Sequence, residues 1–399
     1  MNPRKVLIVD EGASFGGSLI VASHLINFLD QRRYSAELVC EVDKSVLESH
    51  IDPRRLTVIR HGFNYVHHIK FAARISWIRV LLVKKALMYT ISAYAFLRNL
   101  SYRQRLRQLA RAPGVALIHT NNSREAITIG KGLGLPVVWH LHGPLAKRPT
   151  RSDRLALQLV DRLIAVSEYV ADSVRHVGIS DEKLVTIPNP CVMPTGDLRK
   201  ARCLARKNFG IDTDALVFGI VARIVRWKGH VEFLLAAEQV LCQIPGSVAA
   251  IIGDGADFGT DYEQEIRKLA AASAYADRIV FTGYMPNMLT AYAMLDVLVH
   301  TSIEPEPFGL VITEAMAHGV AVVAANLGAP KEIIMDGIDG FLVDPKDARC
   351  LADTICNLLD DVSERERIAE AARRKVEKEY DPTRFSAAVA ALYDTLLSS

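Results

Sequence analysis

Two carboxylates eight positions apart, Glu306 and Glu314, are the residues whose types and spacing best suit chemistry. Between them, Gly309 stands where a helix is predicted to begin after an apolar strand. A loop that enters a helix presents free backbone N–H groups and the positive end of a dipole, and these bind phosphate. Glu314 could then accept hydrogen bonds from ribose hydroxyls, and Glu306 from sugar hydroxyls. The spacing alone favours an acidic first turn that only caps the helix.

Two cations, Arg223 and Lys228, follow another apolar strand at a spacing of five, and Gly229 after them permits close approach of a ligand. An Arg guanidinium forks onto phosphate oxygens, and a Lys ammonium acts as a point charge beside it. The pair could therefore neutralise a diphosphate leaving group. The alternative is a solvated basic turn in which Trp227 packs on the domain surface.

The first half of the chain offers a glycine pair and a histidine pair at strand ends. Gly16 and Gly17 follow the first apolar run and open a helix, which by itself indicates a tight turn. His142 ends another strand, where a His could hydrogen-bond a sugar hydroxyl or stabilise developing positive charge through its carbonyl. His140 lies two positions earlier, on the same face of the strand, and could share that role. A structural His that holds a loop is the competing interpretation.

Short apolar runs alternate with helical stretches throughout, which predicts parallel sheets with helices on both faces. Two such doubly wound sheets would give an α/β protein of two Rossmann-like domains. The Pro-rich stretch 187–196 predicts the linker. The expected domains are residues 1–190 and 191–381, followed by a C-terminal helix over 382–399 that could cross back to the first domain. The predicted strands are 6–9, 36–40, 115–119, 136–140, 163–166, 217–221, 248–252, 279–281, 297–300 and 321–324.

Length and composition indicate the number of domains and the cellular compartment of this protein. A chain of 399 residues suits two domains of roughly 150–200 residues each. Its six cysteines include no CxxC pair, so we interpret them as small buried hydrophobes in a reducing compartment. The sequence shows neither a secretory signal nor an apolar run of eighteen residues, which predicts a cytoplasmic protein.

The segment between Asp52 and Glu125 contains fourteen Lys and Arg residues and no acidic residue. Within it, an apolar helical stripe over 70–90 has basic flanks, as an interfacial helix requires. One interpretation is that residues 70–111 bind an anionic membrane surface, on the inner face of the membrane. An ordinary amphipathic helix that packs on its own domain fits equally, whereas nucleic acid is not expected because no binding motif is present. Salt-sensitive flotation with anionic liposomes separates these alternatives.

The ordered set of motifs in the second half resembles glycosyltransferase family 4. The set comprises Arg223 with Lys228, then Gly253-Asp254-Gly255, then Phe281-Thr282-Gly283, then Ser302 to Glu314, then Asp336 to Val343. The resemblance is to bacterial cell-surface polysaccharide glycosyltransferases. It implies a GT-B fold, in which two Rossmann-like domains face each other across a cleft, and transfer with retention of anomeric configuration.

The resemblance assigns expected roles residue by residue. Arg223 and Lys228 resemble the donor-diphosphate cations, Glu314 the carboxylate that holds the ribose, and Glu306 the carboxylate near the transferred sugar. The remaining matches are the N–H groups of Phe308, Gly309 and Leu310 as a donor cradle, Tyr284 as part of the loop against the base, Gly16 and Gly17 as the phosphate- and acceptor-side glycine pair, and His142 beside the transferred sugar. The sequence departs from the family pattern at Ser18, Pro190, Ala256 and Ala329.

The implied reaction moves a sugar from a nucleoside-diphosphate sugar to a glycan or lipid-linked acceptor. A UDP-sugar is narrowly preferred to a GDP-sugar as donor. No cofactor and no metal are expected, because the cations and helix-end amides would stabilise the leaving group. No covalent nucleophile is assigned. A nucleotide-sugar epimerase, a phosphorylase or a non-catalytic sugar-nucleotide-binding protein on the same fold are the alternatives.

Overall fold

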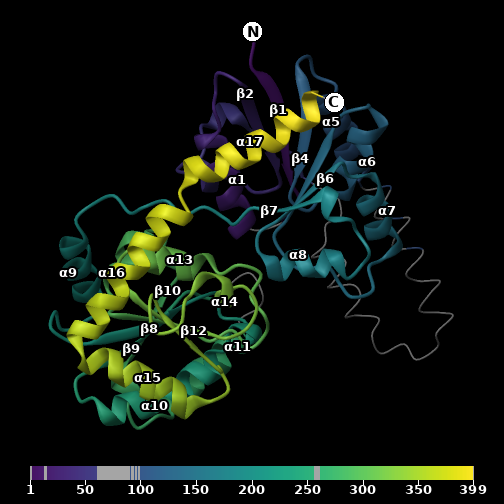
Figure 1. The fold of residues 1–399 in the computed structure, drawn as a ribbon. Helices are drawn as coiled ribbons and strands as arrows, with labels where there is room; N and C mark the ends of the chain where they lie inside the picture. Colours follow the sequence, from purple (N-terminus) through teal and green to yellow (C-terminus); the bar gives the residue numbers. More distant parts are fainter. Residues whose placement is uncertain are drawn as a thin grey trace, which may run out of the picture. The chain divides into compact units, whose positions relative to one another are not determined.

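The computed structural model describes residues 2–12, 16–60, 90, 94, 97, 99–255 and 261–398. Its contacts divide the chain into two compact units, each of which is described by itself (Figure 1). Unit 1 comprises Met1–Val166, Val170–Ile187 and Thr383–Ser399, and unit 2 comprises Ser167–Tyr169 and Pro188–Pro382. The division therefore falls at the Pro-rich segment and again at the start of the last helix.

Unit 1 contains a seven-stranded sheet in the order β3-β2-β1-β4-β5-β6-β7, in which every pair of neighbours is parallel. Its strands are β1 (Arg4–Asp10), β2 (Tyr34–Cys40), β3 (Leu56–Val58), β4 (Val115–Thr120), β5 (Val137–Leu141), β6 (Arg162–Ala165) and β7 (Leu184–Thr186). Its helices are α1 (Gly17–Phe28), α2 (Lys44–Leu47), α5 (Leu100–Ala110), α6 (Arg124–Gly132), α7 (Arg151–Leu159), most of α8 (Glu168–Arg175) and nearly all of α17 (Pro382–Ser398).

Unit 2 contains a six-stranded parallel sheet in the order β10-β9-β8-β11-β12-β13. Its strands are β8 (Val217–Val221), β9 (Val248–Ile252), β10 (Ile279–Gly283), β11 (Val297–His300), β12 (Ala321–Ala325) and β13 (Phe341–Val343). Its helices are α9 (Leu198–Asn208), α10 (His230–Gln243), α11 (Asp261–Ala271), α12 (Met288–Ala293), α13 (Leu310–Ala317), α14 (Pro330–Ile333), α15 (Ala348–Asp360) and α16 (Val362–Glu379).

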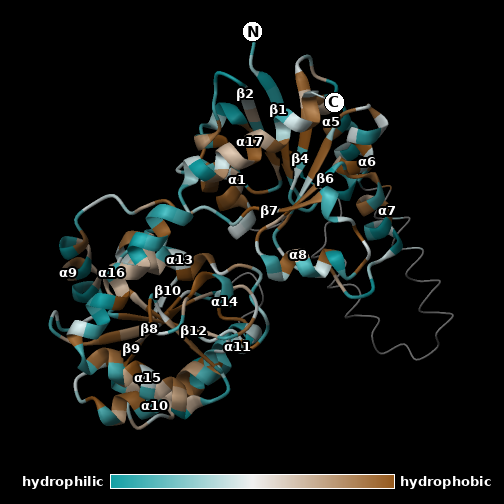
Figure 2. Cartoon of the chain, viewed as in Figure 1, coloured by the Kyte–Doolittle hydropathy of each residue, from teal (hydrophilic) through white to brown (hydrophobic). Residues whose placement is uncertain are grey.

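The two predicted doubly wound parallel sheets are confirmed. Helices cover both faces, so the central strands β8, β11 and β12 of unit 2 are buried throughout. Figure 2 shows the strands as mainly apolar rather than alternating. The ten predicted strands all occur, with ends that shift by up to two residues. Three further strands, β3, β7 and β13, were not predicted, because each has only three residues and lies at an edge of its sheet.

The prediction that the cysteines are buried is wrong for half of them. Cys203, Cys242 and Cys350 are exposed, whereas Cys40, Cys191 and Cys356 are buried. Cys242 follows an apolar dipeptide, but it lies near the end of α10 on the side that faces solvent. A run of apolar neighbours indicates burial in a strand, whereas on a helix the direction of the side chain decides.

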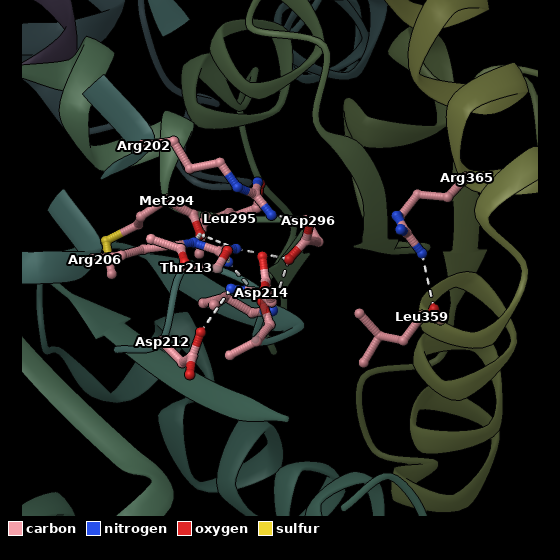
Figure 3. A network of polar contacts seen from close by, with 12 residues as sticks. Arg202, Arg206, Asp212, Thr213, Asp214, Met294, Leu295, Asp296, Leu359 and Arg365 are labelled. Carbon is pink, nitrogen blue, oxygen red and sulfur yellow. Dashed lines mark hydrogen bonds and ion pairs between the residues drawn. The ribbon is translucent and has the colours of Figure 1, made fainter. Parts of the chain in front are cut away.

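A buried ionic network fixes the end of the unit 2 sheet where β8 and β11 begin (Figure 3). The fully buried Arg206 donates to Asp296 at 2.9 Å and to the carbonyl oxygens of Thr213, Ala215 and Met294. Asp296 also accepts from Arg202, at 2.6 Å, and from the first backbone N–H of β8, at 2.8 Å. This network ties α9 and two loops to the sheet, at the edge opposite to the carboxyl ends of the strands.

Candidate functional site

Three loops meet at the carboxyl edge of the unit 2 sheet, after β8, β11 and β12. The N–H of Ile303 donates to the carbonyl of Trp227 at 2.9 Å, which joins the first loop to the second. The N–H of Ala329 donates to the carbonyl of Glu306 at 3.0 Å, which joins the second loop to the third. Ligands of open parallel sheets bind at this edge. The sheet topology therefore brings together motifs about one hundred residues apart.

Two glycines allow the loops to approach so closely. Gly229 has φ +72°, and a Cβ there would lie 1.9 Å from the carbonyl oxygen of Thr301. Gly328 has φ +75°, and a Cβ there would lie 2.5 Å from the carbonyl oxygen of Glu306. Both conformations belong to the left-handed region, where side chains are disfavoured. The glycines are thus required by the geometry of the loops themselves.

Glu306 is held by three donors that all converge on one oxygen. Its Oε2 accepts from the Lys228 ammonium at 2.6 Å, from the Ser302 hydroxyl at 3.1 Å and from Nε2 of His300 at 3.2 Å. Among the described residues, none donates to Oε1. Glu306 is 8% exposed, so this clamp holds an oriented carboxylate whose second oxygen can accept from a ligand.

The clamp also sets the charge state of its members. Burial would raise the pKa of Glu306, but the hydrogen bond from His300 and the charge of Lys228 outweigh burial and lower that pKa to about 2. Burial lowers the pKa of Lys228, against the attraction of Glu306, and the nearby charge of Arg223 lowers it further. Glu306 is therefore an anion at neutral pH and is unsuited to act as a general base.

The structure places Arg223 on the loop after β8, exposed, and Lys228 at its end, with its side chain only 13% exposed. It brings Lys228 to Glu306 as an ion pair, which the sequence does not predict, since the resemblance assigns the two residues to separate parts of the donor. Tyr284 directly follows β10 and is 63% exposed. The site predicted from the sequence did not include His300 and Ser302. His300 is nevertheless the last residue of a predicted strand, and His142 lies two residues after the end of another.

Helix α13 begins as predicted, with Gly309 as the N-cap at φ +102° and Leu310 as its first residue. Phe308 is buried, and its ring packs edge-on against Tyr380 with centroids 5.9 Å apart. The first N–H groups of an α-helix have no partner within the helix. Donors and a positive dipole end therefore lie three residues from the clamped carboxylate of Glu306.

Glu314, in the second turn of α13, accepts a hydrogen bond from the Tyr292 hydroxyl at 2.7 Å. Burial of the carboxyl raises the pKa of Glu314 to about 7, although the bond from Tyr292 works against this rise. The surroundings of the two carboxyls thus act in opposite directions: those of Glu306 favour the anion, and those of Glu314 favour the protonated form.

We expect Glu314 to make folding stability depend on pH. A carboxyl with a raised folded pKa binds its proton more tightly when folded, so its contribution is present below the unfolded pKa of 4.5 and is lost as pH rises to about 7. The free energy of unfolding should therefore fall between pH 5 and pH 8 more steeply in the wild type than in Glu314→Gln. Urea denaturation at both pH values measures this difference, and equal slopes would contradict the burial of this carboxyl.

In unit 1, Gly16 is the N-cap of α1 and Gly17 its first residue. Gly16 is extended, with φ −164°, a conformation that any residue adopts, and no described atom lies within 4 Å of a Cβ placed there. His142 directly follows β5, and its ring lies 4.3 Å from that of His140 between centroids. Burial lowers the pKa of His142 to about 4, against the attraction of Asp10, so the ring is neutral at pH 7.

The predicted interfacial helix over 70–90 lies outside the described residues, apart from Thr90. Of the remaining basic segment, α5 carries Arg105 and Arg107 on its exposed side and Arg103 partly buried. Within the described ranges, no helix has the length and apolar character needed to cross a membrane.

Models of two known families match the chain, one in each half. The model described as Glycosyltransferase Family 4 matches residues 15–191, and the model described as Glycosyl transferases group 1 matches residues 202–375. The D-inositol 3-phosphate glycosyltransferase of Mycolicibacterium smegmatis is 29% identical over 62% of this chain, which spans only 55% of that relative. The lipopolysaccharide core biosynthesis mannosyltransferase LpsB of Rhizobium meliloti is 27% identical over 65% of this chain and 80% of its own length.

Solved structures resemble the whole chain. Anabaena HepE in complex with UDP-glucose has a TM-score of 0.78 at 23% identity, covering 98% of this chain and 99% of that one. A glycosyltransferase from Rickettsia africae has a TM-score of 0.79 at 19% identity, covering 100% and 99%. At this identity the likeness shows a shared fold.

Proposed function

Because this chain belongs to glycosyltransferase family 4 and has the GT-B fold, we propose that it transfers a sugar from a nucleoside-diphosphate sugar to an acceptor with retention of anomeric configuration. The observation that carries this proposal is the Glu306 clamp beside the start of α13. It offers an oriented anion for sugar hydroxyls next to amide donors and cations for phosphate. The proposed catalytic residues are Glu306 and His142.

In the proposed donor complex, Arg223 and Lys228 face the diphosphate together with the N–H groups at Phe308, Gly309 and Leu310. Lys228 already contacts Glu306, so its ammonium would lie between that carboxylate and the phosphates and join the two halves of the donor. Charge that develops on the leaving diphosphate would be stabilised by these groups, without a metal or a cofactor. The acceptor hydroxyl attacks on the face from which the diphosphate leaves, and the departing phosphate takes its proton.

Glu314 is proposed to accept from the ribose hydroxyls, and Tyr284 to lie against the base. Two hydroxyl donors would stabilise the ionised form of Glu314 and so lower its pKa from about 7. Gly16 and Gly17 are proposed to let the donor phosphate or the acceptor approach the backbone. This fits Gly16, since neither its φ nor any described neighbour calls for glycine.

A UDP-sugar is the proposed donor, since Anabaena HepE, a protein of this fold, binds UDP-glucose in its crystal structure. The proposed acceptor is a glycan or a lipid-linked glycan, as the name of the Rhizobium relative suggests. Attachment of the basic segment to an anionic membrane surface would place the enzyme beside such an acceptor, and flotation with anionic liposomes tests it.

A thermal-shift panel of UDP, GDP, ADP and dTDP at millimolar concentration tests the donor site. A ligand at ~100 times its Kd should stabilise the protein by about 2.7 kcal/mol. We expect UDP to raise the Tm of the wild type and to leave that of Arg223→Ala/Lys228→Ala unchanged. Removal of Lys228 also leaves Glu306 without its counter-charge, which changes the Tm of the ligand-free variant. The quantity to compare is therefore the change in Tm that the ligand causes in each protein.

The matched control is Lys346→Ala/Arg349→Ala, which removes two exposed positive charges from the same unit. This control should keep the full UDP shift. A UDP shift that survives in the Arg223/Lys228 variant would refute the assigned donor site. Analysis of products then separates transfer, which forms a new glycosidic bond, from epimerisation, which only isomerises the donor.

A further inference from the structure

Three histidines of unit 1, of which His119 and His140 are buried and His142 is partly buried, form a chain of neighbouring rings that ends on the C-terminal helix. Nε2 of His119, in β4, lies 3.3 Å from Nδ1 of His140, in β5, and the His140 ring lies 4.3 Å from that of His142. At the other end, the hydroxyl of Tyr393 lies 2.7 Å from Nδ1 of His119. Tyr393 belongs to α17, so a residue from the end of the sequence reaches β4, the neighbour of the strand that precedes His142. Figure 1 shows α17 beside the strands of this unit.

Each ring of this chain is neutral at physiological pH. Burial lowers the pKa of His119 to about 3 and that of His142 to about 4, and it lowers the pKa of His140 well below its ordinary value. A neutral imidazole has one N–H donor and one nitrogen acceptor. The chain therefore has only two possible directions of hydrogen bonding, and each direction fixes the tautomers of His119 and His140.

The two directions differ in the number of polar groups that they leave unsatisfied. If Tyr393 donates to His119, then Nε2–H of His119 donates to Nδ1 of His140, and only Nε2–H of His140 lacks a partner. In the opposite direction the Tyr393 hydroxyl loses its acceptor, since its one partner among the described residues is His119, and Nε2 of His140 has no donor. A buried polar group without a partner destabilises the fold, so the first direction, which leaves fewer such groups, is favoured.

We propose that Tyr393 is a positioning residue: through His119 it fixes His140 as the Nε2–H tautomer, and the fixed His140 ring, which lies 4.3 Å from that of His142, supports His142 in the orientation that sugar transfer requires. The proposal rests on the proposed function, in which His142 lies beside the transferred sugar. It makes the C-terminal helix a part of the site in unit 1. Nε2 of His140 and Nε2 of His142 are both buried and lack partners among the described residues. These two nitrogens are therefore where the row of histidines would receive a polar ligand atom or a water.

Docking of α17 does not depend on the Tyr393 hydroxyl. The Tyr34 hydroxyl donates to Asp394 at 2.6 Å, Arg33 forms an ion pair with the same carboxylate, and the Ser386 hydroxyl donates to the carbonyl of Phe28 at 2.9 Å. The Tyr393 ring also packs edge-on against that of Tyr34, with centroids 5.5 Å apart. Tyr393→Phe therefore removes the hydrogen bond to His119 and keeps the packing of the helix.

The matched control is Tyr34→Phe, which removes one hydroxyl from the same helix interface without contact to a histidine. Side-chain ¹⁵N NMR at pH 7 should find His119 and His140 as Nε2–H tautomers in the wild type and in Tyr34→Phe, and as mixtures in Tyr393→Phe. We expect kcat to fall about tenfold in Tyr393→Phe, with KM for the donor unchanged, and to stay within twofold of wild type in Tyr34→Phe.

Nδ1–H tautomers in the wild type, or full kcat in Tyr393→Phe, would overturn the proposal. An equal loss of kcat in both variants would also overturn it, since that result indicates only weaker docking of α17. A wild-type chain with the expected tautomers but without transfer or donor hydrolysis would refute the proposed function instead, and the role of Tyr393 in fixing the tautomers would stand.

Discussion

Glu306→Gln is expected to lower kcat for sugar transfer by about 10²–10³-fold, while the chain still folds. The amide keeps the shape of the carboxyl but has only one acceptor oxygen. If that oxygen stays toward the three donors that now converge on Oε2, the NH2 group takes the place of Oε1 and can no longer accept from a sugar hydroxyl. The amide also lacks the negative charge that now faces Lys228.

The same change should lower the free energy of unfolding by about 3 kcal/mol, since it leaves the ammonium of Lys228 largely buried without a counter-charge. Steady-state kinetics with a saturating donor and urea denaturation measure the two effects. Glu304→Gln, an exposed change two residues earlier on the same loop, is the control and should alter neither. If kcat in Glu306→Gln stayed within threefold of wild type, Glu306 would not be the oriented acceptor that we propose.

Arg206→Met is expected to have the largest effect on stability, about 3–5 kcal/mol, without a change in nucleotide affinity per folded molecule. The methionine fills the space but leaves Asp296 and three backbone carbonyls with fewer donors in a fully buried place. Burial already lowers the pKa of Arg206 against the attraction of Asp296, which shows how completely this cation depends on its partners. The network lies where β8 and β11 begin, at the edge of the sheet opposite to the candidate site.

Arg202→Met is the matched control, because Arg202 donates to the same carboxylate from a position that is about a third exposed. Solvent screens such a pair, so its loss should cost about 1 kcal/mol or less. Urea-dependent hydrogen exchange of the amides in β8 and β11 measures the stability of unit 2 alone. This is needed because a chain of two units does not have a single free energy of unfolding. Equal losses in the two variants would show that burial of Arg206 adds nothing to the ion pair.

The sequence by itself determined the elements and their order. Apolar runs of four or five residues bounded by Gly, Pro and polar residues locate the central strands, because strands buried on both faces must be apolar throughout. It also determined which residue types stand after those strands, since Arg223, Lys228, Glu306 and His142 follow strand ends in the linear order. The short edge strands escaped prediction because three residues carry no periodicity.

Only the tertiary structure decided which of these residues meet. No spacing in the sequence relates Lys228 to Glu306, or Tyr393 to His119, because such pairs lie 78 and 274 residues apart. Parallel topology brings the ends of β8 and β11 to one edge, and glycines at 229 and 328 let the loops touch there. Burial then sets the charges: Glu306 and Glu314 are the same residue type, but the partners of the first lower its pKa to about 2, whereas desolvation raises that of the second to about 7. Desolvation and charge pairing depend on distances in space, and the order of residues along the chain does not contain them.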